Sequence, residues 1–190
     1  MRSQIRISLV TLGLFTILTG LVYPMVVTGI AQWIFPHQAN GSLMEQNGQM
    51  IGSELIGQSF TELWYFWGRP SATAPYPYNA AASSGSNLGP TNPALEQAVQ
   101  ARVNALQAAD PENRLPIPVD LVTSSASGLD PHISVAAAYY QVPRVARARN
   151  LSEEQVRRLV QQNIQGRQLG FLGEPRVNVL TLNMALDGLQ

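Results

Sequence analysis

The stretch Ile7–Ile30, ISLVTLGLFTILTGLVYPMVVTGI, decides the architecture of this chain. It carries no charged side chain, and as an α-helix it would rise about 36 Å, enough to cross a hydrocarbon core of about 30 Å. Arg2 and Arg6 precede it, and the next basic residue is Arg69. Because positive charge stays on the cytoplasmic side, we expect residues 1–35 to form a cytoplasmic tip and one transmembrane helix, with residues 36–190 outside the cytoplasm.

A cleaved signal peptide is the alternative interpretation of this apolar stretch. Gly29-Ile30-Ala31 resembles a small-residue cleavage site. The apolar run is about twice as long as the roughly 7–15 residues usual in the apolar region of a signal peptide. The length therefore favours a retained anchor over a secreted binding protein released by cleavage.

Small residues recur along the predicted span at steps of three and four. This stripe consists of Gly13, Thr16, Gly20, Pro24, Thr28 and Ala31. Lipid does not require such a stripe, whereas a second helix packs closely against one. We therefore expect this face to contact a partner helix. Pro24 lacks a backbone N–H, so it should also leave one carbonyl without its helical donor and kink the span.

Residues 36–190 are expected to form a single α+β domain in which helices dominate. Pro36–Gln49 is predicted to be a link leaving the membrane, and Gln49–Phe60 a small strand pair divided by glycines. Trp64–Pro93 is dense in aromatic residues, Pro, Gly, Ser and Asn, which predicts a long irregular segment. Its aromatic side chains could line a contact surface, although a place in the core is the simpler expectation for several of them.

Helix signals follow. Asn92 is a suitable N-cap before Pro93, and the helix should run until Asp110-Pro111 stops it. Pro116–Thr123 is predicted to contain a short strand. Asp130 is expected to cap a further helix that begins at Pro131, breaks before Pro143 and resumes to Arg149.

The clearest local signal is Leu151–Leu159, LSEEQVRRL. Ser152 and Gln155 have the spacing of a capping box, and Leu151 and Val156 that of a hydrophobic staple. The sequence predicts a helix there, whose buried face would consist of Val156, Leu159, Val160 and Ile164. The last segment, Val177–Leu189, fits either a strand or a helix, and helix is the preferred interpretation.

Composition excludes several classes of chemistry. The chain has no cysteine and no lysine, so thiol catalysis, a P-loop and a lysine Schiff base are absent, and its net charge of zero does not favour nucleic acid as a partner. His37 and His132 are the only histidines and lack metal-ligand spacing, so no metal site is predicted.

One loop invites a catalytic interpretation. Val122–Ser134, VTSSASGLDPHIS, combines four serines and an aspartate with His132. A membrane-anchored extracytoplasmic hydrolase that uses the Ser124–His132 loop is therefore an alternative function. No G-x-S-x-G elbow is present, and triad members usually lie far apart in sequence. Serines and Gly128 suit a tight turn with local hydrogen bonds, which is the preferred interpretation.

Taken together, strings along the whole chain resemble one family, the C subunits of the bacterial Kdp potassium-transporting P-type ATPases. The residues that carry the resemblance are Gln32–Leu43 (QWIFPHQANGSL), Leu55–Phe60 (LIGQSF), Tyr65–Thr73 (YFWGRPSAT), Tyr78–Leu95 (YNAAASSGSNLGPTNPAL), Asp120–Ser134, Val142–Gln155 (VPRVARARNLSEEQ) and Gly173–Asp187 (GEPRVNVLTLNMALD).

The resemblance implies a single-pass subunit of the plasma (inner) membrane with an extracytoplasmic domain. It implies three partners: a potassium-translocating subunit, a P-type ATPase subunit and a small single-span subunit. The complex handles ATP and potassium, and this chain would be an accessory subunit without chemistry or a cofactor of its own. It would assemble and stabilise the complex, and it has been described as a catalytic chaperone that raises the ATP affinity of the ATPase subunit.

Within the same resemblance, Leu151, Ser152 and Gln155 are likened to a nucleotide-contacting signature. The predicted topology places Gln155 outside the membrane, whereas ATP is cytoplasmic. The capping box also accounts for Ser152 and Gln155 without a ligand. A structural role for these residues is therefore preferred.

Overall fold

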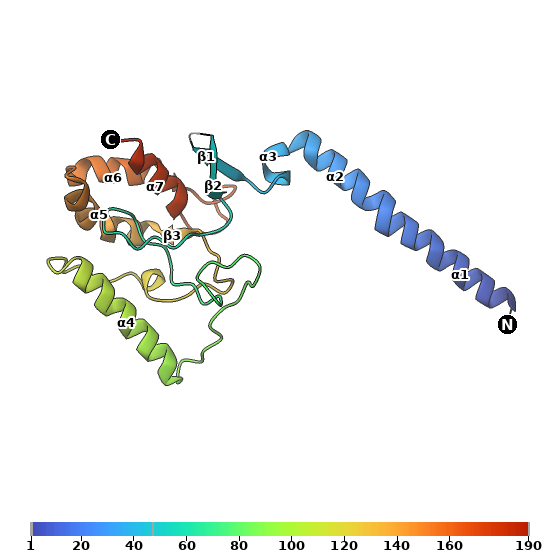
Figure 1. Ribbon diagram of the computed structural model, residues 1–190, viewed down its shortest axis with the longest axis horizontal. Helices are drawn as coiled ribbons and strands as arrows, with labels where there is room; N and C mark the ends of the chain where they lie inside the picture. The colour runs from blue at the N-terminus through green and yellow to red at the C-terminus, as the bar shows by residue number, and fades with distance from the viewer. Residues whose placement is uncertain (1, 47, 190) are drawn as a thin grey trace. The chain divides into compact units, whose positions relative to one another are not determined.

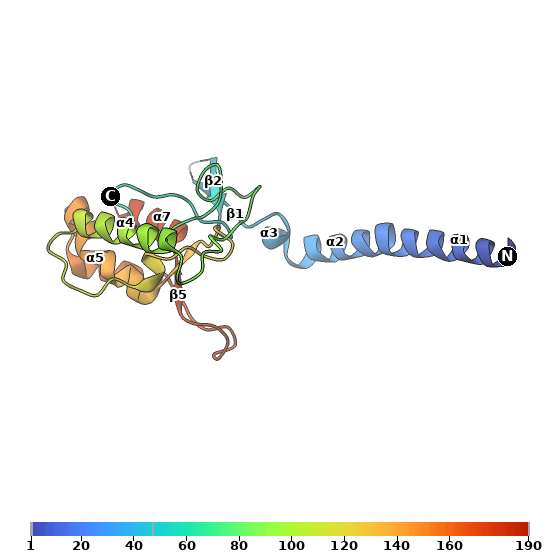
Figure 2. The same cartoon turned by 90° about the horizontal axis from the view of Figure 1, so that it is seen from below.

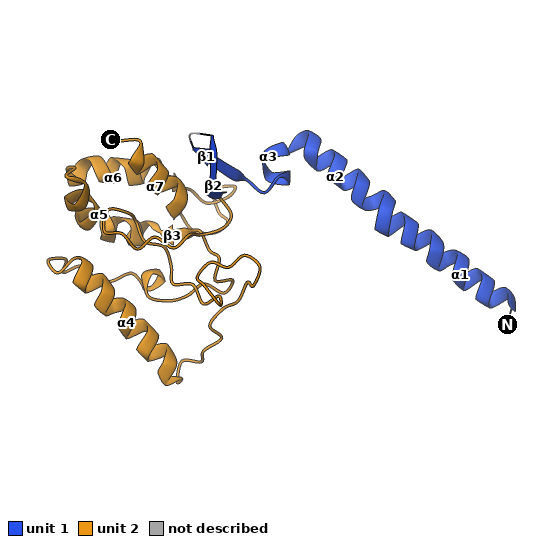
Figure 3. Ribbon diagram, in the orientation of Figure 1, with its two compact units in different colours: residues 1–53 blue, residues 54–190 orange. Residues whose placement is uncertain are grey.

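The computed structural model describes residues 2–46 and 48–189, which belong to two compact units, Met1–Ser53 and Glu54–Gln190 (Figure 3). The first unit contains the apolar helix and a strand pair, and the second contains the mixed helix and sheet domain (Figure 1). The predicted class, α+β with one N-terminal apolar helix, is confirmed.

The apolar helix runs without interruption from Arg2 to Ile34. It contains an apolar stretch of 18 residues, about the length of a membrane span, and none of these residues is buried within the chain. It comprises α1 (Arg2–Ile17), a π-helical turn η1 (Leu18–Val22) and α2 (Tyr23–Ile34). Pro24 is the second residue after the π-helical turn, and the Thr19 hydroxyl donates to the carbonyl of Phe15 at 2.7 Å. The backbone disturbance expected before Pro24 is therefore a widened, π-helical turn. The helix tolerates the proline because the local hydrogen bonding is rearranged.

A short helix, α3 (Pro36–Ala39), and an antiparallel hairpin complete the first unit. The hairpin pairs β1 (Leu43–Gln46) with β2 (Gln49–Ser53). The predicted bounds of this region were wrong. Strand β1 lies within Pro36–Gln49, which was predicted to be a link, and β2 ends at Ser53, well before Phe60. Gly48 precedes β2 with a φ of +76°, a backbone conformation that glycine adopts readily.

The second unit begins with a long segment, residues 54–92, that contains no helix or strand in its described residues. This confirms the irregular segment predicted for Trp64–Pro93. Phe66 and Trp67 are buried in the core, while Trp64 and Tyr76 are exposed. The aromatic run therefore divides between the core and the surface.

Helix α4 (Pro93–Ala109) begins as predicted, with the Asn92 side chain accepting from the backbone N–H of Ala94 at 3.0 Å. The strand predicted over Pro116–Thr123 was wrong. That segment forms a 3₁₀ turn, η2 (Val119–Leu121), whose backbone bonds run from Leu121 to Pro118 and from Val122 to Val119. Leu121 is fully buried, so one apolar side chain is placed in the core without extended backbone.

Helix α5 (Val135–Arg149) differs from the prediction at its start and in its middle. Ser134, not Asp130, is the N-cap, because His132–Ser134 form strand β3. Pro143 lies inside an unbroken helix. The missing N–H is tolerated there because Val142 and Val145 on either side are fully buried, and this packing holds the helix together.

The C-terminal part consists of α6 (Glu153–Gln162), β4 (Ile164–Gln165), β5 (Arg176–Asn178) and α7 (Val179–Asp187). The strands form an antiparallel sheet in the order β3-β5-β4. Ile164 was expected on the buried face of a helix, but it pairs with Val177 in this sheet. The preferred interpretation of Val177–Leu189 as a helix is confirmed for Val179–Asp187, and only Val177 and Asn178 at its start belong to a strand, β5.

The core forms where α5, α6 and α7 pack with Phe66 and Trp67. The segment Leu63–Arg69, which we name the braced segment, begins in a turn and then runs on without pairing as a strand. Its seven successive carbonyl oxygens accept side-chain hydrogen bonds of 2.5–3.1 Å, in chain order from Arg144, Arg149, Arg144 again, Asn183, Gln141, Arg102 and Tyr78. Side-chain donors therefore replace the backbone hydrogen bonds that a neighbouring strand would supply.

Candidate functional site

The serine-rich loop is a turn built from its own side chains. The Ser125 hydroxyl accepts from the backbone N–H of Gly128 at 2.9 Å, and the Ser127 hydroxyl accepts from the N–H of Leu129 at 3.1 Å. Gly128 has a φ of +67°. These hydrogen bonds are those of a tight serine turn, so the preferred interpretation of the loop is confirmed in its geometry.

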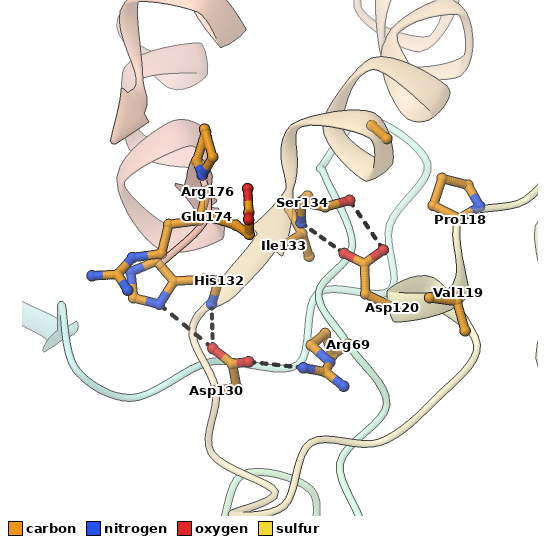
Figure 4. A pocket seen from close by; sticks show the side chains of 12 residues that line it. Arg69, Pro118, Val119, Asp120, Asp130, His132, Ile133, Ser134, Glu174 and Arg176 are labelled. Atoms are coloured by element: carbon orange, nitrogen blue, oxygen red, sulfur yellow. Dashed lines mark hydrogen bonds and ion pairs between the residues drawn. The ribbon is translucent and has the colours of Figure 1, made fainter. Parts of the chain in front are cut away.

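Asp130 and His132 lie at the end of that loop, in an open pocket of about 620 Å³ (Figure 4). Asp130 Oδ1 accepts from the backbone N–H of His132 at 3.0 Å and lies 3.5 Å from His132 Nδ1. Asp130 Oδ2 accepts from Arg69 Nη1 at 3.1 Å. Burial by itself would raise the pKa of Asp130, but the hydrogen bonds from His132 and the charge of Arg69 outweigh it and lower this pKa below its usual value.

Arg69 is the residue of this cluster that the sequence reasoning missed. It stands far from the loop in sequence, and its guanidinium also donates to the carbonyl of Ser124 at 3.2 Å. The signal that could have pointed to it is the YFWGRP string, which ends the braced segment at Arg69. Arg69 thus connects the braced segment to the serine turn and satisfies Asp130.

Ser134 is the serine nearest to His132 on β3, and it is committed to a different partner. Its hydroxyl donates to Asp120 Oδ1 at 3.1 Å, and its N–H donates to Asp120 Oδ2 at 2.7 Å (Figure 4). The same hydroxyl accepts from the N–H of Ala137 as the cap of α5. Within the described residues, no serine hydroxyl bonds His132, so the nucleophile and base of a hydrolase are not brought together.

These two aspartates also close one edge of the sheet. The N–H groups of His132 and Ser134 donate to Asp130 and Asp120, so they are not available to a further strand beside β3. An open edge would invite pairing with another chain. The carboxylates of this pocket therefore have structural roles. Among residues 2–46 and 48–189, no group of three or more His, Asp or Glu side chains is arranged to hold a metal ion.

The residues likened to a nucleotide signature form the predicted capping box. Ser152 Oγ accepts from the N–H of Gln155 at 3.2 Å, and Gln155 Oε1 accepts from the N–H of Ser152 at 2.9 Å. Leu151 packs against the core, to which the fully buried Val156 belongs. A small open pocket of about 240 Å³ beside them includes Gln155 and Arg158. The capping box is complete without a ligand.

The small-residue stripe lies on the exposed apolar helix of the first unit. An added Cβ at Gly13 or Gly20 would meet no atom of the chain within 4 Å. The contact of this face with a partner helix stays a prediction.

These features define an α+β domain that is joined to one helix long and apolar enough to span a membrane, and whose polar clusters support its own backbone. Residues 5–188 match the family described as K+-transporting ATPase, c chain. The chain therefore belongs to this family, as the sequence resemblance indicated. The family's chains are the accessory subunit of the complex and not the catalytic one.

Curated relatives match over their whole length and share the name Potassium-transporting ATPase KdpC subunit. The chain is 66% identical over 190 residues to the protein of Herpetosiphon aurantiacus, covering 100% of this chain and 98% of the relative. It is 63% identical over 188 residues to that of Sorangium cellulosum, covering 99% of each. It is 62% identical over 190 residues to that of Methylococcus capsulatus, covering 100% of each.

Proposed function

We propose that this chain is a single-pass subunit that assembles and stabilises a potassium-importing ATPase complex from outside the cytoplasm. The observation that carries the proposal is the helix Arg2–Ile34, which has a mean hydropathy of 2.0 over its membrane-length window. Its basic residues, Arg2 and Arg6, both precede the apolar run. By the positive-inside rule, the N-terminus lies in the cytoplasm and residues 36–190 form the extracytoplasmic domain.

The proposed partners are a potassium-translocating subunit, a P-type ATPase subunit and a small single-span subunit. The stripe from Gly13 to Ala31 would pack against a membrane helix of one of them. The second unit would dock on the outer face of the potassium-translocating subunit. ATP and potassium would be handled by those partners, with no cofactor held by this chain.

An effect on the ATP affinity of the ATPase subunit would then pass through the assembly. With the second unit outside, Leu151, Ser152 and Gln155 cannot reach cytoplasmic ATP, and the hydrogen bonds between Ser152 and Gln155 begin helix α6. Binding of an accessory subunit to one state of the ATPase subunit can raise its ligand affinity without touching the ligand. We therefore assign these three residues a structural role.

Size-matched glycine variants test the role of the span. Gly13→Leu should prevent close helix approach and lower recovery of the partners about tenfold when the full-length chain is pulled down in detergent. Gly29→Leu is the control, since Gly29 lies off the stripe and an added Cβ there also meets no atom of the chain within 4 Å. Equal recovery of partners with both variants would contradict a role for the stripe. Absence of the partners from the unaltered chain's pull-down would contradict the proposed function.

A further inference from the structure

The connection between β4 and β5 projects from the rest of the second unit (Figure 2). We name residues 166–175 the β4–β5 arm. Its backbone is closed by a reciprocal pair, in which Gln168 N donates to Leu172 O and Leu172 N donates to Gln168 O, both at 2.9 Å. An ion pair of 2.7 Å between Arg167 and Glu174 joins its two sides. The arm is therefore a hairpin-like projection with its own internal bonds.

The tip of this arm is apolar and exposed to solvent. Leu169 is 82% exposed, Phe171 69% and Leu172 48%. None of the three belongs to the core of the second unit or packs against it. Three neighbouring large apolar side chains at the end of a projection contribute nothing to the folding of the domain, and such exposed groups mark interaction sites.

The backbone of Leu169 adds an independent observation. Its φ is +53°, in the left-handed region that glycine and asparagine adopt readily and a bulky residue rarely does. Gly170 follows with a φ of +82°. Both the exposure of this apolar side chain and its left-handed backbone are unfavourable in the folded chain. An outlier of this kind points to a function for the side chain that the fold itself does not explain.

We propose that the tip of the β4–β5 arm inserts into an apolar groove on the extracytoplasmic face of a membrane-embedded partner subunit. This inference rests on the proposed function, because it needs the second unit outside the cytoplasm and a subunit beside it. It identifies Leu169, Phe171 and Leu172 as the contact that docks the domain.

The size of the tip favours a tethered partner. Stable interfaces between separate proteins bury about 1,200–2,000 Å² in total, and three side chains fall well short of that area. A second copy of this chain would therefore not be held by the tip alone. A subunit held next to the span of this chain is different, because the tether makes docking effectively intramolecular and a small contact then suffices.

The composition of the arm favours protein over lipid. Segments that lie on a membrane surface present several Lys or Arg residues together with Trp, Phe or Leu. The only basic residue of the arm, Arg167, is neutralised by Glu174. A backbone held in one conformation does not strengthen binding to fluid lipid, whereas it does strengthen binding to a groove of fixed shape.

Arg176 at the base of the arm provides a polar rim. Its Nε donates to Gln165 Oε1 at 3.3 Å, and it is paired with no carboxylate among residues 2–46 and 48–189. An apolar centre with a polar rim is the usual composition of a protein interface. An acidic group at the edge of the partner's groove would complement Arg176.

A pair of variants separates docking from folding. Leu169→Asn suits the left-handed backbone, so the melting temperature of the chain should not fall. The double variant Leu169→Asn, Phe171→Ser should lower recovery of the chain through a tag on the potassium-translocating subunit about tenfold. Leu115→Asn is the matched control, since Leu115 is an exposed leucine of the same unit and lies outside the arm. Recovery of the double variant at the control's level would overturn the docking role.

A photo-crosslinker identifies what the tip contacts. Phe171→p-benzoylphenylalanine would be introduced into the full chain within the intact complex in membranes, and the adducts identified by mass spectrometry. The expected product is an adduct with a membrane-embedded subunit of the complex. Adducts with lipid alone, adducts with a second copy of this chain, or no adduct at all would each overturn the proposal.

The two tests distinguish this inference from the proposed function. If the unaltered chain recovers its partners but the arm variants recover them equally well, the arm is not the docking element and the accessory role remains. If the unaltered chain recovers no partner, the proposed function fails and the arm has no subunit to contact.

Discussion

Replacing Arg144 by methionine is expected to lower the free energy of unfolding of the second unit by about 3–5 kcal/mol. The side chain is 4% exposed and donates to the carbonyls of Leu63 and Tyr65 and to Gln141 Oε1 at 2.5–3.0 Å. Its guanidinium carbon lies 4.4 Å from the centre of the Trp67 ring. Methionine fills much of the space but leaves the carbonyls of Leu63 and Tyr65 without this donor, while Gln141 Oε1 keeps only the backbone N–H of Trp67 at 2.8 Å.

The charge state of Arg144 supports this large effect. Burial lowers the pKa of Arg144 to about 10, so the guanidinium remains protonated near neutral pH. The charged group is thus kept buried for its hydrogen bonds to the braced segment. Truncating a buried charged donor is costly because its acceptors stay desolvated.

Unfolding of the full-length chain in denaturant, followed by tryptophan fluorescence, measures the effect. Arg158→Met is the matched control, because Arg158 forms only an exposed i,i+4 pair with Glu154 at 3.0 Å and should cost less than about 0.5 kcal/mol. Equal unfolding midpoints for the two variants would show that the braced segment does not depend on Arg144.

The second large effect is expected at Gly128 in the serine turn. Gly128→Ala should destabilise the chain by about 2–4 kcal/mol. An added Cβ would lie 2.5 Å from the carbonyl oxygen of Ser84 and 2.6 Å from Thr73 Cγ2, and the φ of +67° disfavours any side chain. Backbone oxygen cannot move away as a flexible side chain would, so the turn would have to shift.

Gly89→Ala provides the comparison, since an added Cβ there meets no atom within 4 Å and its φ is not in the left-handed region. It should change the free energy of unfolding by less than about 1 kcal/mol. A Gly128→Ala chain that unfolds at the same denaturant concentration as Gly89→Ala would contradict the close packing of the serine turn against Thr73 and Ser84.

Features encoded within a few residues were predictable from the sequence. The apolar helix needed only composition and length, and the starts of α4 and α6 needed only Asn92 and the Ser152–Gln155 capping box. These signals are local, since the side chain and the backbone group it caps lie within three positions. Contacts with distant parts of the chain did not change where these helices begin.

The start of α5 was not predictable for the opposite reason. Asp130-Pro131 and Ser134 are both suitable helix starts in sequence. The choice is made by β5, which pairs with His132–Ser134 and holds these residues extended. A strand contributed from far along the chain leaves no signal near residue 130.

The hydrogen bonds of the braced segment and of the pocket could likewise not be predicted from the sequence. The donors to Leu63–Arg69 come from α4, α5 and α7 and from Tyr78, and the partner of Asp130 is Arg69. A sequence shows which residues can donate but not which carbonyls they meet. The serines of the loop could nevertheless be assigned to a turn, because their partners lie within a few residues.

The proposed topology has a retained span that holds the second unit outside the cytoplasm, away from ATP. The chain has no cysteine, so a single introduced cysteine reports one position. Glu154→Cys places it on the exposed surface of α6, where the side chain of Glu154 is 78% exposed, and Ser3→Cys places it in the N-terminal tip.

Intact cells that carry each variant would be treated with a membrane-impermeant maleimide before and after permeabilisation, and the full-length chain recovered from the membrane fraction. We expect Glu154→Cys to be labelled in intact cells and Ser3→Cys to be labelled only after permeabilisation. Labelling of Glu154→Cys only after permeabilisation, or recovery of a shortened chain without its N-terminal helix, would show that the span does not hold the second unit outside the cytoplasm.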